Sequence, residues 1–296
     1  MAQRKKFQDL NLNNAYLFAA ALGDEETCHL VLELILGRPI GKLSVTAEKL
    51  LLYSSDFRCV RLDIFAKDDM EVNYNLEMQN QQKGNLPKRS RYHQAEMDAT
   101  SLKPGKDFND LKPSVIVFIC SFDPFEDGLY RYSFEKRCIE NNMRLEDETA
   151  IIFLNTKGKN PEDVPKVLID FLNYIDNSTD EFVKETHNDS IQKLHDRVKA
   201  LKRDRRLEGN YMYFEELLRD RESIGREEGK AEGRVENTIL KVLCKKDKNL
   251  DVATIAEHLE EPEDFVMKIC TLKEENPQAD AAQIYELLQK EPMETI

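Results

Sequence analysis

The sequence lacks tryptophan altogether and contains only 11 glycines and 10 prolines in 296 residues. It also lacks any apolar run near the roughly 20 residues that a membrane-spanning helix needs. The longest such run, residues 115–120, has the length of a strand. The basic residues near the N-terminus are not followed by the apolar segment of a signal peptide. These absences predict a chain without a membrane span or a cleaved leader.

Motifs for zinc centres and for nucleotide binding are missing as well. The six cysteines form no CxxC pair, the five histidines form no HExxH pair, and neither GxxxxGK[ST] nor GxGxxG occurs. Several cysteines lie within apolar segments, which is typical of buried free thiols in a reducing compartment. We therefore expect a soluble cytoplasmic protein with no nucleotide cofactor.

Positive charge is in deficit. The chain has 43 Lys and Arg residues against 56 Asp and Glu residues, a net charge of −13. Such a chain should not coat nucleic acid indiscriminately, because its average field repels phosphate. The excess is uneven, however: residues 156–296 carry a net charge of −9 and residues 1–155 only −4. The acidity therefore describes the C-terminal half more than the N-terminal half.

Residues 1–180 have the pattern of one α/β domain. An apolar helix is expected over residues 15–22, and a second follows from Asp24, which can cap it, to Gly37, which can end it. Two alternating strands, a polar helix, two apolar strands and a last helix come next. Their expected ranges are residues 57–66, 72–79, 87–102, 114–122, 150–155 and 164–175.

The remaining sequence is helical in pattern. Residues 181–234 are expected to form a charged connector in which Gly225, Gly229 and Gly233 recur at every fourth position, either on a solvated helix or where two helices approach closely. Residues 235–296 are expected to form a small helical domain. Its segments 254–259 and 264–272 have the outline of a helix-turn-helix, but the second begins with acidic residues, which favours protein packing over a DNA groove.

The two strands with alternating apolar residues contain the candidate catalytic residues. Their apolar residues share one face, so Asp63, Glu77 and Gln79 share the other. With the turn centred on Asp69, Asp63 lies opposite Asn75 and diagonal to Glu77, near enough for both carboxylates to reach one ion. Hard oxygen ligands suit Mg²⁺ or Mn²⁺. The alternative is an ordinary polar face on an exposed hairpin.

A basic stretch follows directly. Residues 78–95 contain no acid, although the whole chain is strongly acidic. Basic and aromatic side chains at this place suit the phosphates and bases of a nucleic acid, although a solvated helix face would have the same composition. The candidate DNA-binding residues are Lys83, Lys88, Arg89, Arg91 and Tyr92.

Taken together and in this order, the motifs around Asp63, the segment Leu76-Glu77-Met78-Gln79 and the segment from Pro87 to Tyr92 resemble the PD-(D/E)xK nuclease superfamily. More narrowly, the chain is similar to the bacterial family of recombination-promoting nucleases and transposases, from about residue 12 to residue 174. The resemblance implies a restriction-endonuclease-like α/β core, a central mixed sheet flanked by helices, followed by a charged helical region and a small helical C-terminal domain.

The same resemblance implies the chemistry of the site. Asp63 and Glu77, with the Met78 backbone carbonyl, would hold Mg²⁺ or Mn²⁺, and Gln79 would take the place where the superfamily usually has lysine. The first helix, residues 14–22, offers no further acid. The implied activity is Mg²⁺-dependent endonucleolytic cleavage of double-stranded DNA by a homodimer, in recombination, transposon-related processing or defence against foreign DNA. The alternative is a weak or inactive nuclease fold that acts as an interaction protein and oligomerises through its helical tail.

Overall fold

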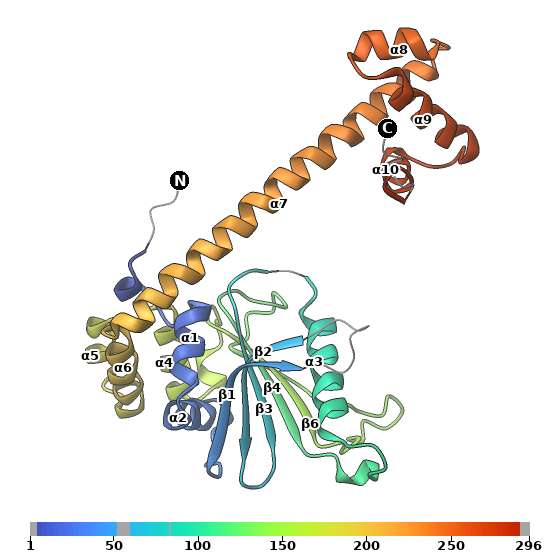
Figure 1. Cartoon of the computed structure of the whole chain (residues 1–296). Helices are drawn as coiled ribbons and strands as arrows, with labels where there is room; N and C mark the ends of the chain where they lie inside the picture. The colour runs from blue at the N-terminus through green and yellow to red at the C-terminus, as the bar shows by residue number, and fades with distance from the viewer. Residues whose placement is uncertain (1–4, 52–59, 83, 291–296) are drawn as a thin grey trace. The chain divides into compact units, whose positions relative to one another are not determined.

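The computed structural model describes residues 5–51, 60–82 and 84–290 (Figure 1). The chain divides into two units, residues 1–211 and residues 212–296. Some expectations lie outside the described residues: the candidate DNA-binding residue Lys83, and the start of the strand expected over residues 57–66, which includes Cys59. Among the described cysteines, those that are free are Cys28, Cys120, Cys138, Cys244 and Cys270. No helix in the described ranges combines the length and apolar composition that a bilayer crossing requires.

The first unit is built on a mixed sheet. Within the described residues, six strands lie in the order β1-β2-β3-β4-β6-β5. β3, β4 and β6 run parallel to one another, and the other neighbouring pairs are antiparallel. The strands are β1 (Leu43–Leu51), β2 (Val60–Asp68), β3 (Asn73–Gln79), β4 (Ser114–Cys120), β5 (Arg131–Phe134) and β6 (Thr149–Asn155). The mixed α/β architecture is confirmed; β1 and β5 were not expected from the sequence.

Capping residues set the first two helices. Asn14 accepts a hydrogen bond from the Leu17 N–H at the start of α1 (Ala15–Leu22). Asp24 caps α2 (Glu25–Leu36) by accepting from the N–H and the hydroxyl of Thr27. Gly37 ends α2 in the left-handed conformation at φ 67°, which glycine adopts without steric cost. Both expected helices are therefore confirmed.

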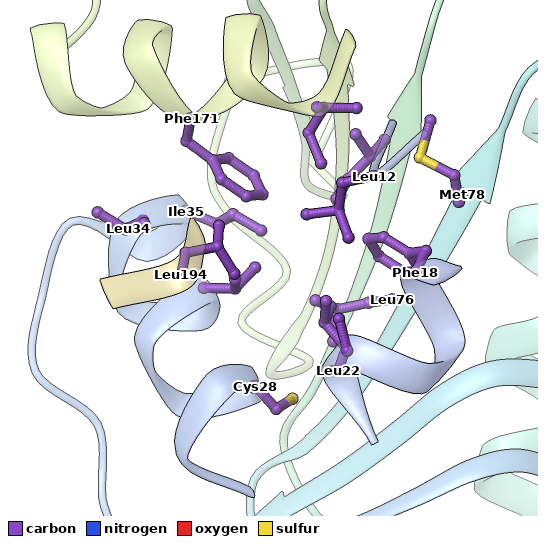
Figure 2. Packing of buried hydrophobic residues seen from close by; sticks show 14 of the residues in the cluster. Leu12, Phe18, Leu22, Cys28, Leu34, Ile35, Leu76, Met78, Phe171 and Leu194 are labelled. Atoms are coloured by element: carbon purple, nitrogen blue, oxygen red, sulfur yellow. The ribbon is translucent and has the colours of Figure 1, made fainter. Parts of the chain in front are cut away.

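Helices cover the sheet on both faces. α1, α2 and α4 (Lys166–Asp176) lie on one face and α3 (Leu86–Ser101) on the other (Figure 1). The first layer buries Leu76 and Met78 of β3 against helical side chains such as Phe18 and Phe171 (Figure 2). The second layer is smaller and includes Phe118. β3 is consequently buried on both faces through Met78. Short 3-10 helices span Phe7–Asp9, Phe108–Asp110 and Pro161–Asp163.

The turn between β2 and β3 is centred one residue later than expected. The Asp68 carboxylate accepts from the N–H groups of Met70 and Val72. The register pairs Phe65, not Asp63, with Asn75. The expected pairing of Asp63 with Asn75 is therefore wrong. Moving the centre by one residue shifts the register by two, and a shift of two leaves every side chain on its expected face.

Two further helices extend the first unit past residue 180, the domain boundary expected from the sequence. They are α5 (Asp180–Thr186) and α6 (Asp189–Lys202), followed by α7 (Arg205–Lys246), within which the first unit ends at Tyr211. α6 joins the core because its apolar side chains recur on one face. Those of its residues that are buried there are Ile191, Leu194 and Val198.

The second unit is helical. Besides the rest of α7 it contains α8 (Val252–Leu259), α9 (Glu263–Glu275) and α10 (Ala281–Lys290), whose core includes Ile239, Ile255 and Ile269. The two helices expected around residue 260 are present. A Cβ added at Gly225, Gly229 or Gly233 would meet nothing within 4 Å in the described part of the chain. Among the described residues of one chain, no second helix therefore lies close to these glycines.

A chain of polar contacts joins α4, α5 and α6. The Tyr174 hydroxyl lies 3.0 Å from His195 Nδ1, and His195 Nε2 lies 2.7 Å from the Asp180 carboxylate. The Lys199 ammonium donates to both oxygens of Asp180 at 2.7 and 2.8 Å. Hydrogen bonds from Lys199 and then His195 lower the pKa of Asp180 to about 2. The ionised carboxylate therefore stabilises the fold.

We expect Asp180→Asn to flatten the acid dependence of stability. A carboxylate with a lowered pKa in the folded state contributes stability above its ordinary pKa of about 4, and that contribution is lost as the pH falls through about 2. Thermal unfolding across this interval should therefore show a smaller fall in midpoint for Asp180→Asn than for the wild type. Asp196→Asn, which removes an exposed carboxylate of α6 outside this chain of contacts, should keep the wild-type slope; equal slopes for all three proteins would contradict the prediction.

Candidate active site

Asp63 of β2 and Glu77 of β3 lie beside each other on the sheet face that α3 covers. The Asp63 N–H donates to Glu77 Oε1 at 3.2 Å, and the Met78 N–H donates to Asp63 Oδ2 at 3.1 Å. Asp63 is half-buried, whereas Glu77 is 0% exposed. The expected shared face is confirmed in the geometry, but it is not an exposed hairpin surface. Glu77 lies between the sheet and α3, and Asp63 lies beside it.

Burial makes the ionised form of Glu77 costly. Loss of hydration raises the pKa of Glu77, and the neighbouring Asp63 carboxylate raises it further. The positive charge of Arg89 acts in the opposite direction. A carboxylate pair in this environment favours a cation, because a positive charge relieves both the repulsion and the desolvation.

Arg89 of α3 supplies positive charge at this place. Its Nη2 donates to Glu77 Oε2 at 2.7 Å and its Nη1 donates to Gln79 Oε1 at 3.1 Å. Its Cζ lies 5.6 Å from the centre of the Phe118 ring, within the range of a cation–π contact. Arg89 is one of the candidate DNA-binding residues, and here its guanidinium bridges the acid and the amide of the candidate site.

Two further polar side chains, His93 and Asn75, lie at the site, although neither is among the candidate site residues. His93 Nδ1 lies 3.6 Å from Glu77 Oε1 and 3.2 Å from the amide nitrogen of Asn75, and His93 Nε2 accepts from Arg89 Nε at 3.5 Å. Burial and then the charge of Arg89 lower the pKa of His93 to about 4, so the ring is neutral near pH 7. Arg89 and His93 are four residues apart, a spacing that places both on one helix face and could have revealed the pair.

The other candidate DNA-binding residues lie elsewhere on α3. Lys88, Arg91 and Tyr92 are exposed. Of these, Lys88 and Arg91 flank Arg89 in the sequence, so solvent-facing cations adjoin the buried site. Arg89 itself has a side chain that is 33% exposed, so it connects the exposed surface with Glu77.

The donor set fits a hard divalent cation. Two adjacent carboxylates are available, and the Met78 N–H points toward Asp63, so the Met78 carbonyl faces the same strand edge. All three are the oxygen ligands that Mg²⁺ and Mn²⁺ prefer. In the described ranges, no three His, Cys, Asp or Glu side chains gather as a metal cage. Such a site would leave coordination positions to water and substrate.

Comparison with known proteins now decides the family. Residues 13–228 match the family described as PD-(D/E)XK nuclease family transposase. The chain belongs to this family. The match supports a nuclease-type function and covers every candidate site residue. Searches of curated proteins and of solved structures gave no match. In this PD-(D/E)XK protein, Asp63 and Glu77 lie on the neighbouring strands β2 and β3, and Gln79 follows two residues after Glu77.

Proposed function

We propose that the chain is a Mg²⁺-dependent endonuclease that hydrolyses phosphodiester bonds in double-stranded DNA. One observation carries the proposal: Asp63 and Glu77 lie side by side under α3, with Glu77 fully buried. Burial of an acid beside a second acid costs stability and is retained mainly where the pair has a task. In a family of nucleases, that task is to hold a divalent metal.

In this proposal, Asp63, Glu77 and the Met78 carbonyl hold the cation. When bound, Mg²⁺ or Mn²⁺ supplies charge to the phosphate and lowers the pKa of a water molecule. The Met78 N–H fixes the Asp63 carboxylate by its hydrogen bond at 3.1 Å. Gln79 orients the attacking water through its neutral amide. His93, neutral at physiological pH, accepts from Arg89 Nε and positions the guanidinium beside Glu77 in the metal-free chain.

Substrate binding follows the basic side of α3. Lys88 and Arg91 are exposed and contact phosphates, and Tyr92 supplies an aromatic surface beside them. Two chains acting as a homodimer would cut one strand each. The family description favours a role in recombination or transposon-related processing, with defence against foreign DNA as another use of the same reaction.

The proposal is tested by incubating supercoiled plasmid with the purified full chain and Mg²⁺ or Mn²⁺. We expect nicked and linear products with either metal, none with EDTA, and a loss of at least about 100-fold in Asp63→Asn, because this change removes a ligand oxygen. The chain must stay folded, which circular dichroism checks. If the folded wild type does not cleave with any divalent metal, the proposal fails, and a non-catalytic interaction protein that oligomerises through its helical tail takes its place.

A further inference from the structure

We propose that Arg89 is an exchangeable counter-charge: it neutralises Glu77 in the metal-free chain and moves from Glu77 to a DNA phosphate when a divalent metal binds. The inference rests on the proposed function, since it assumes that Glu77 is a metal ligand. It adds a coupling between metal binding and DNA binding. Arg89 acts in it as a positioning residue, without touching the reacting atoms.

Both oxygens of Glu77 are already engaged. Oε1 accepts from the Asp63 N–H at 3.2 Å, and Oε2 accepts from Arg89 Nη2 at 2.7 Å. The main-chain donor is fixed in β2, whereas the guanidinium ends a long side chain. A cation that binds Glu77 therefore competes with Arg89, and Arg89 is the group that can leave.

The Arg89 guanidinium can move from Glu77 toward the exposed surface. Its side chain is 33% exposed while Glu77 is fully buried, so the path of the guanidinium leads outward from the carboxylate. Gln79 accepts from the other arm of the guanidinium at 3.1 Å and is half-buried. Because the Gln79 amide is neutral, it can bind the Arg89 guanidinium without neutralising its positive charge. Released from Glu77, the planar fork matches the geometry of a phosphate.

The exchange makes the two ligands cooperative. A metal ion that displaces Arg89 frees a cation for DNA, and a phosphate that draws Arg89 away leaves Glu77 open to the metal. Thermodynamic linkage requires the two effects to be equal in size. The exposed neighbours Lys88 and Arg91 bring phosphate to the same end of α3.

The first test measures the affinity for Mn²⁺ alone, by the electron paramagnetic resonance signal of the free ion, at alkaline pH where protons compete least. We expect Arg89→Gln to bind Mn²⁺ between about 5- and 150-fold more tightly than the wild type. Arg91→Gln is the matched control, because it removes the same charge from the same helix without touching Glu77; it should stay within about twofold of the wild type. Equal shifts in both variants, or weaker binding in Arg89→Gln, would overturn the inference.

A second test follows Arg89 in the wild-type protein. In wild-type protein with ¹⁵N-labelled arginine, the Arg89 Nε–H resonance, assigned by its loss in Arg89→Lys, should shift and exchange faster with water when Mg²⁺ is added. The Arg91 resonance should not move. An Arg89 resonance that is unchanged at saturating Mg²⁺ would overturn the exchange. If the Mn²⁺ affinity of Glu77→Gln equals that of the wild type, the proposed metal site itself fails, which is a different result.

Discussion

Replacing Glu77 with glutamine is expected to lower metal-dependent nicking of plasmid DNA by more than about 100-fold. Glutamine has nearly the same volume, so the space under α3 stays filled. The change removes the negative charge that a metal needs and the carboxylate oxygen that accepts from Arg89 at 2.7 Å. Because burial raises the pKa of Glu77, a neutral side chain at this place costs less desolvation than the carboxylate. The fold should therefore survive while activity is lost.

Glu71→Gln is the matched control for this prediction. Glu71 lies in the turn between β2 and β3, half-exposed, and pairs with Lys67 and Lys112 on the surface. The chemical change is the same and the same hairpin is altered, but no candidate ligand is touched. We expect wild-type nicking in Glu71→Gln. Full activity in Glu77→Gln, or equal losses in the two variants, would remove Glu77 from the reaction.

Phe118→Ala is expected to cost about 3–5 kcal/mol of unfolding free energy, the usual range for a fully buried phenylalanine. Phe118 is 0% exposed and stacks on Phe153, with ring centres 5.2 Å apart. Its other neighbours are the His93 ring at 5.9 Å and the guanidinium of Arg89. The cavity would therefore open directly beneath the candidate site. Urea unfolding gives the free energy, and nicking well below the unfolding midpoint gives the activity.

Phe171→Ala separates stability from site geometry. Phe171 is equally buried but belongs to the layer of α1, α2 and α4 on the opposite face of the sheet (Figure 2). We expect a similar loss of stability in both variants, but lower activity of the folded protein only in Phe118→Ala. Phe118→Leu should cost less than about 1.5 kcal/mol, because it keeps most of the apolar volume. Loss of activity in Phe171→Ala under folding conditions would show that the effect is not local.

The periodicity of two strands was enough to predict the shared face of the site. Alternation in β2 and β3 assigns Asp63, Glu77 and Gln79 to one side when the apolar residues of the two strands share the other. The turn between β2 and β3 is centred on residue 70, one later than expected, and the resulting register error of two residues preserves that assignment. The ends of α2 were equally predictable, because aspartate is a preferred N-cap residue and glycine is a preferred residue at a helix C-terminus.

Burial of the site could not be predicted from the same pattern. A polar strand face normally meets water, but here α3 covers it. The inner face of α3 combines Leu86 and Met97 with the polar residues Ser90, His93 and Gln94. Gln94 donates to the Ser114 hydroxyl at 2.7 Å, so a polar side chain of the helix pairs with one of the sheet. Such matching depends on residues distant in sequence, and only the fold brings them together.

The most direct test of the account is a crystal structure of the full chain grown with Mn²⁺, with anomalous data collected at the manganese edge. The account predicts a peak bonded to carboxylate oxygens of Asp63 and Glu77, with Arg89 moved off Glu77. No peak at these two carboxylates at saturating Mn²⁺, with Arg89 still on Glu77, would contradict the proposed metal centre and the nuclease mechanism built on it.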